Sequence, residues 1–137
     1  MKKTSESISN TTKGYFTYRG GEGQLSFLLH RITGLGTLLF LTIHIIDTAM
    51  VYFFPPLYEE ALVLYRNPVF MVGEIGLVFF VIFHGVNGLR IAYIDLFKPS
   101  KWRIEAQRKA VRWTLGLSII LWIPPAVIMA NKLISNL

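Results

Sequence analysis

Three long apolar runs alternate with shorter polar segments along this chain and predict its architecture. Asn67 and Pro68 stand directly before the second run, and such a pair is a typical helix start. Pro124 and Pro125 lie inside the third run and predict a kink, which helices in a bilayer tolerate. About 20 helical residues cross a bilayer core, so we expect an all-α membrane protein with three transmembrane helices. The expected spans cover about residues 32–54, 69–94 and 113–133.

The residues before the first run are polar and predict a cytoplasmic N-terminal arm over residues 1–24. They contain no short apolar core followed by small residues, so they do not form a secretory signal. They are also poor in arginine, which argues against a mitochondrial transit peptide. From about Gly23 the arm is expected to lie along the membrane surface, and residues 25–137 are expected to form one membrane-anchor domain.

Composition supports residence in a lipid bilayer. Of the 137 residues, 53% are hydrophobic and only 16% are charged, which is too little charge to cover a soluble domain of this size. The formal net charge of +6 does not indicate nucleic-acid binding, because the basic residues stand in segments that flank the apolar runs. The membrane surface is therefore the expected partner of these charges.

The distribution of lysine and arginine predicts the orientation of the chain. The loop after the first run has only Arg66, and the C-terminus has only Lys132. Basic segments stay on the cytoplasmic side, so we expect the N-terminus inside and the C-terminus outside. The expected location is a prokaryotic cytoplasmic (inner) membrane, crossed several times. The basic residues expected inside are Lys2, Lys3, Lys13, Arg19, Arg31, Lys98, Lys101, Arg103, Arg108, Lys109 and Arg112.

Glycines inside the runs favour close approach between helices. Three helices with polar residues facing inward are not expected to suffice alone, so we predict that they pack with a partner membrane subunit into a larger bundle. The glycines concerned are Gly34, Gly36, Gly73, Gly76, Gly85, Gly88 and Gly116.

Polar residues in the second run are the main candidates for chemistry. His84 stands in an apolar stretch, where a polar group is costly unless it is bound. Gly88 lies on the same face one turn later and leaves room for a flat macrocycle beside a histidine that ligates iron. Arg90 lies about 9 Å further along the helix axis, where it and Arg31 can pair with carboxylates. Spacing alone fits equally well a histidine bonded to a neighbouring helix and an Arg90 that reaches the headgroups.

The chain contains no cysteine, which limits the cofactors it can hold. Disulfides, cysteine-ligated iron–sulfur clusters and a covalently attached c-type haem are excluded. Any redox cofactor must therefore be held by histidine or methionine without a covalent link.

Two motifs resemble the cytochrome b membrane-anchor subunit of succinate dehydrogenase, respiratory complex II. "LLHRITGLGTLLF" matches an H-R-x-[ST]-G box at the start of the first helix, and "FHGVNGLRIAYIDL" matches an H-x-x-x-G-[IL]-R box that ends in an aspartate. The likeness covers about residues 25–97 together with the three-span plan. The matching residues are His30, Arg31, Thr33 and Gly34 in the first box and His84, Gly88, Leu89, Arg90 and Asp95 in the second.

The resemblance implies a haem b and a quinone site. His84 is then an axial ligand of the haem iron, and a second membrane-anchor subunit supplies the other ligand. Ser26 and Arg31 are implied to form part of the quinone site, where a carbonyl that gains electrons needs charge-assisted donors. The other residues implied to lie near this haem are Gly88, Arg31, Arg90 and His30.

The chain departs from the family pattern in two places. Many members have a serine four residues before the arginine of the first box, where this chain has Phe27 and the serine is Ser26. Many also have a histidine directly after the arginine of the second box, where this chain has Ile91. The first departure weakens the assignment of Ser26, and the second leaves more of the propionate pairing to Arg90 and Arg31.

His44 is a second candidate ligand in the first run. It lies about 20 Å from Arg31 by helical rise, so it is expected at a different depth from His84. Relatives with two haems place ligands on the first two helices at staggered depths, so one haem is expected and a second at His44 is open. The alternative is an imidazole satisfied by Asp47 or by a backbone carbonyl.

The favoured function is a membrane-anchor subunit that binds haem b, forms part of the quinone-reduction site and attaches the iron–sulfur and flavoprotein subunits. No residue resembles a flavin site, so the chain is not expected to oxidise succinate itself. Two alternatives remain: a fumarate reductase membrane subunit, which has the same architecture, and a non-redox scaffold or transporter component. The sequence does not distinguish ubiquinone from menaquinone.

Overall fold

The computed structural model describes residues 7, 10 and 21–135, and within these residues the fold is helical without a strand. The predicted arm therefore lies almost entirely outside the described residues. The helices are α2 (Glu22–Phe53), α3 (Pro55–Tyr65), α4 (Pro68–Phe97), the short 3-10 helix η1 (Pro99–Lys101) and α5 (Ile104–Ser135).

The prediction of three membrane spans is confirmed. Helices α2, α4 and α5 are each long and apolar enough to cross a bilayer. Two of them begin earlier than the apolar runs, α2 at Glu22 and α5 at Ile104, because a helix continues into polar residues where hydropathy no longer marks it. We expected the residues from about Gly23 to lie along the membrane surface as part of the arm. They instead form the first turns of α2, continuous with the span.

Proline starts two of the helices. Asn67 caps α4 by accepting a hydrogen bond from the Val69 backbone N–H at 2.9 Å, and Pro68 follows it, as the sequence predicted. Pro55 and Pro56 follow the end of α2 and also open α3, which lies in a segment that was expected to be a loop. Helix α5 continues through Pro124 and Pro125 without a break.

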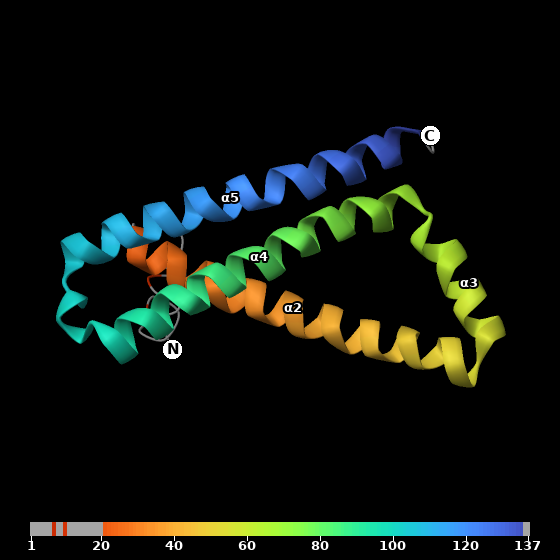
Figure 1. Cartoon of the computed structure of the whole chain (residues 1–137), viewed down its shortest axis with the longest axis horizontal. Helices are drawn as coiled ribbons and strands as arrows, with labels where there is room; N and C mark the ends of the chain where they lie inside the picture. The colour runs from red at the N-terminus through yellow and green to blue at the C-terminus, as the bar shows by residue number, and fades with distance from the viewer. Residues whose placement is uncertain (1–6, 8–9, 11–20, 136–137) are drawn as a thin grey trace.

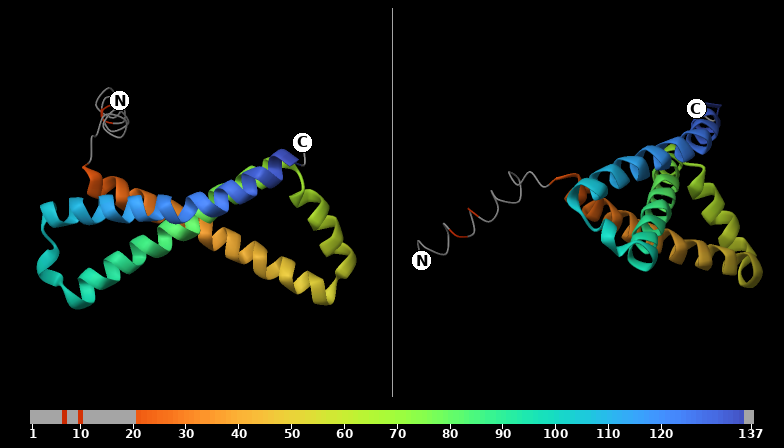
Figure 2. Two further views of the ribbon diagram at one scale, coloured as in Figure 1. Left: turned by 45° about the horizontal axis from the view of Figure 1, so that its top comes forward. Right: turned by 60° about the vertical axis from the view of Figure 1, so that its left-hand side comes forward.

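Helix α4 is the centre of the arrangement. Figure 1 shows α5 running alongside α4, while α2 crosses α4 and then diverges from it toward α3. The other views show the same crossing, with α3 spanning the wide end between α2 and α4 (Figure 2). An ion pair between Glu22 and Arg112, with Oε1 and Nη2 2.5 Å apart, ties the start of α2 to α5 at the narrow end.

Small and polar side chains fill the contacts between the helices. Asn87 and Ser118 are fully buried, and the Ser118 hydroxyl donates to the Thr114 backbone oxygen at 2.8 Å. Most large apolar side chains face outward, where lipid or a partner subunit can cover them. Lipid tails are as apolar as leucine, so packing and hydrogen bonds hold membrane helices together. Among residues 21–135, the few buried apolar side chains are Met71, Phe83, Ile94 and Val111.

Candidate functional site

The two boxes of the sequence meet where α2 crosses α4. The imidazole rings of His30 and His84 are stacked, with centroids 4.1 Å apart and planes within 3° of parallel. Gly34 allows this contact, because a Cβ at that position would lie 2.7 Å from His84 Cε1. The two boxes therefore meet because α2 and α4 cross closely at Gly34.

One nitrogen of His84 is already engaged. His84 Nδ1 lies 3.1 Å from the backbone oxygen of His30, which also accepts a hydrogen bond from the Thr33 hydroxyl at 3.2 Å. A carbonyl only accepts, so this contact requires the proton on Nδ1 and leaves the Nε2 lone pair available to a metal. Histidines that ligate metals are commonly held in this way, with the second ring N–H on a carbonyl.

The glycine beside the His84 ring is Gly34 rather than Gly88. A Cβ at Gly88 would meet the His30 ring instead, at 3.7 Å from Cε1, which is an ordinary contact. Within this chain Gly34, not Gly88, makes the space for the His84 ring. The expectation that Gly88 leaves room for a haem stays a prediction.

The two arginines expected near the propionates differ in setting. Arg90 is partly buried, with Nη1 3.4 Å from Gln107 Oε1 and a buried Nε that has no partner among the described residues. Arg31 is exposed and lies over the Phe27 ring, with Cζ 5.3 Å from the centroid. Both cations therefore have hydrogen-bond donors left for an anionic group.

Ser26 faces the interior of the bundle. It is 4% exposed, and its hydroxyl donates to Asn87 Oδ1 at 3.2 Å, across the contact between α2 and α4. The Asn87 amide nitrogen is buried without a partner among the described residues. The sequence predicted no role for Asn87, although an asparagine in an apolar run is a visible signal.

A second candidate site lies at the wide end of the bundle. A cavity of about 770 Å³ opens between α2, α3 and α4, with largely apolar walls and His44 at its edge. The His44 ring stacks on Phe40, with centroids 5.6 Å apart, and forms no hydrogen bond with another described residue. Asp47 forms no hydrogen bond with His44 in the described part of the chain, and its Oδ2 accepts one from the Tyr65 hydroxyl.

The bond to Asp47 changes the acidity of Tyr65. The hydrogen bond to the carboxylate raises the pKa of the Tyr65 hydroxyl to about 12, and burial and the nearby charges of Asp47 and Glu74 act in the same direction. Tyr65 therefore remains protonated, and bonded to Asp47, throughout the physiological pH range.

Comparisons with known proteins agree with the geometry. A family model described as "Succinate dehydrogenase/Fumarate reductase transmembrane subunit" matches residues 9–124, which include both boxes. A curated relative, the succinate dehydrogenase 2 membrane subunit SdhC of Mycobacterium tuberculosis, is 32% identical over 132 residues. That alignment covers 96% of this chain and 94% of the relative.

Proposed function

Because this chain belongs to the family of succinate dehydrogenase/fumarate reductase transmembrane subunits, we propose that it is the haem b-binding anchor of a succinate:quinone oxidoreductase. Family membership and the three spanning helices make it a multi-pass protein of the bacterial inner membrane. As a membrane subunit of such a complex, it works with other subunits. The haem, the quinone contact and the individual partners are the parts that we propose.

His84 is the residue that would ligate the iron. The observation that carries the proposal is its fixed ring: Gly34 admits the imidazole, and the His30 carbonyl at 3.1 Å engages Nδ1. A ring held in this way presents an unprotonated Nε2 without further rearrangement. As the family resemblance implies, a second ligand for the iron would come from the partner membrane subunit.

The charged residues suit the carboxylates of a haem. Arg90 has a buried Nε without a described partner, and Arg31 lies exposed at the start of the same crossing. Guanidinium groups form strong charge-assisted hydrogen bonds with carboxylates. A bound haem would supply one-electron chemistry between the iron–sulfur subunit and the quinone, while this chain would hold its propionates through Arg90, Arg31 and His30.

Arg31 is the better supported of the two predicted quinone contacts. Its guanidinium is exposed and can donate to a quinone carbonyl as negative charge develops there. Ser26 would have to give up its bond to Asn87, or share it, before donating to a quinone. Near this site the basic loop between α4 and α5 would attract an iron–sulfur subunit by charge.

A second haem, if the complex holds one, would lie in the cavity at His44. Its volume of about 770 Å³ lies within the usual range of small-molecule sites, and the His44 ring forms no hydrogen bond with the residues that the structure describes. Two haems per flavin in the purified complex would support this site. One haem per flavin, retained in a His44→Ala variant, would dismiss it.

The difference spectrum of the purified complex tests the proposal. We expect a reduced-minus-oxidised b-type band that is lost or shifted in His84→Ala, while the exposed control Thr42→Val keeps the wild-type spectrum. A silent wild-type spectrum would favour the non-redox scaffold instead. The direction of the reaction, succinate oxidation or fumarate reduction, requires the activity of the whole complex.

A further inference from the structure

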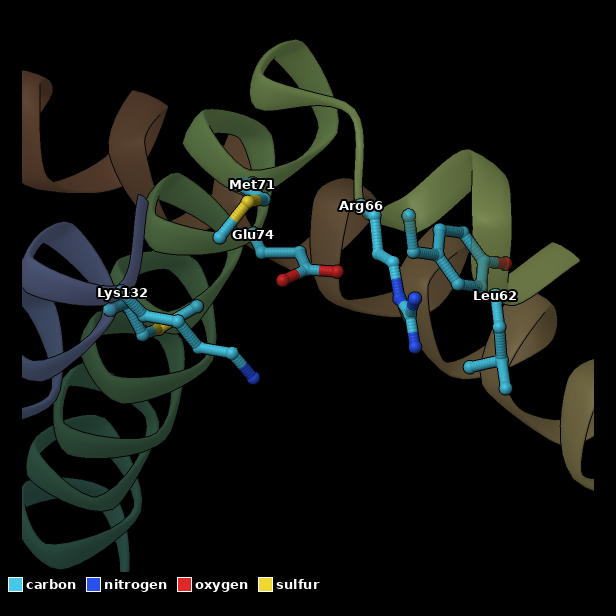
Figure 3. A pocket seen from close by; sticks show the side chains of 7 residues that line it. Leu62, Arg66, Met71, Glu74 and Lys132 are labelled. Carbon is cyan, nitrogen blue, oxygen red and sulfur yellow. The ribbon is translucent and has the colours of Figure 1, made fainter. Parts of the chain in front are cut away.

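A second cavity, of about 750 Å³, lies at the end of the bundle opposite the basic loop. It is formed where the end of α3, the first turns of α4 and the last turns of α5 come together, and Figure 3 shows it from close by. It shares Leu62, Tyr65 and Glu74 with the cavity at His44, so the two adjoin.

The cavity gathers the two basic residues of this end of the chain. Arg66 and Lys132 are 66 positions apart in the sequence but line the same hollow. Their charged ends and the carboxylate of Glu74 point into the space between them (Figure 3). None of the three forms an ion pair with another described residue. The two cations are therefore available to a ligand.

The rest of the wall is apolar. Leu62, Met71 and Met129 line it. Tyr65 adds the apolar face of its ring, since its hydroxyl is hydrogen-bonded to Asp47. Cations above an apolar wall, at the end of membrane-spanning helices, match an amphiphile with an anionic head. With Glu74 ionised, two cations and one carboxylate leave one positive charge, which equals the charge needed to balance a phosphodiester.

We propose that this cavity binds one anionic phospholipid. The Arg66 guanidinium would hold the phosphate by paired hydrogen bonds, and Lys132 would act as a point charge beside it. An acyl chain would lie along Leu62, Met71 and Met129. Basic pockets between membrane helices are known to hold lipid headgroups. Such a lipid would fasten α5 to α3, two helices without a described hydrogen bond between them.

Native mass spectrometry of the purified complex, exchanged into micelles that contain phosphatidylglycerol, tests this proposal. We expect one retained phosphatidylglycerol per copy of this chain. Arg66→Gln or Lys132→Gln should each weaken retention about fivefold, and the double variant about twentyfold or more. The charge-preserving controls Arg66→Lys and Lys132→Arg should lose much less, and Glu74→Gln should strengthen retention. The mass of the intact complex reports assembly in the same spectrum.

Two competitors identify the source of the anion. Diacylglycerol with the same chains lacks the phosphate and should not displace the lipid, and an excess of inorganic phosphate should displace little of it. Displacement by phosphate would overturn the lipid assignment in favour of a free-anion site. Unchanged retention in the assembled double variant, or weaker retention in Glu74→Gln, would also overturn the proposal.

Discussion

Gly34 and His84 share one contact between α2 and α4, so a change at the glycine must move the imidazole. In Gly34→Ala the new Cβ would lie 2.7 Å from His84 Cε1, and the ring has to shift by several tenths of an ångström. Overpacking of this kind costs about 1–3 kcal/mol, while alanine gains about 0.5–1 kcal/mol in helix propensity. We therefore expect a small change in unfolding temperature but a clear loss or shift of the haem band.

Gly23→Ala is the matched control, because a Cβ there meets no atom within 4 Å. This variant should be slightly more stable, because alanine has a higher helix propensity than glycine, and its visible spectrum should be unchanged. If Gly34→Ala behaves in the same way, the imidazole is not seated against Gly34.

Ser26 and Asn87 form a buried hydrogen-bonded pair. A role of Ser26 in stability can be separated by experiment from a role in quinone binding. In Ser26→Ala the fully buried Asn87 Oδ1 loses its donor, which should cost about 1–3 kcal/mol of stability. The double change with Asn87→Leu should be less damaging than the sum, with a coupling of about 0.5–3 kcal/mol. A quinone contact predicts in addition a raised KM for quinone. A raised KM without the loss of stability would contradict the pairing described here.

Residue types were enough to propose an inner site from the sequence, but the contacts between the helices could not be predicted from them. His84, Arg90 and Arg31 stood out because charged and polar groups are costly in apolar runs. Which groups face them depends on the angle at which α2 crosses α4. The hydrophobic pattern of one helix does not predict the angle between two helices. The carbonyl of His30 and the side chain of Asn87 are therefore seen only in the fold.

At the scale of elements, α3 shows that a pair of prolines can mark both the end of one helix and the start of the next. The first span is expected to end at about residue 54, and α2 ends at Phe53, but the two prolines that follow are equally suited to the first turn of a helix and begin α3. Hydropathy located the three spans, because each is a long apolar run. It did not locate the polar first turns of α2 and α5, since their residues resemble those of a loop.

The bond between Tyr65 and Asp47 ties α3 to α2 and predicts a specific pH dependence. The pKa of Tyr65 is raised from 10.0 to about 12, so the bond stabilises the fold below pH 10 and is lost as the pH rises through about 12. Tyr65→Phe should lower the unfolding temperature at pH 7, and its difference from the wild type should vanish above pH 12.

Tyr58→Phe is the control on the same helix, because its hydroxyl bonds no described residue. It should leave the unfolding temperature unchanged at both pH values. A Tyr65→Phe variant as stable as the wild type at pH 7 would contradict the bond to Asp47.

At the scale of the whole molecule, the distribution of charge predicts its orientation. The absence of cysteine allows single introduced thiols to report it without background. In intact cells with an accessible outer face of the membrane, Ser135→Cys should react with a membrane-impermeant maleimide, and Ser100→Cys should react only after permeabilisation. The reverse pattern would invert the orientation and would place the basic loop, with its expected iron–sulfur partner, on the wrong side.

The density beside His84 in a cryo-electron microscopy map of the purified complex tests whether this histidine holds a haem. We expect a flat macrocycle between α4 and the partner membrane subunit, with its metal bonded to His84 Nε2 and its carboxylates near Arg90 and Arg31. A map that shows only packed side chains or lipid next to Nε2 would contradict it.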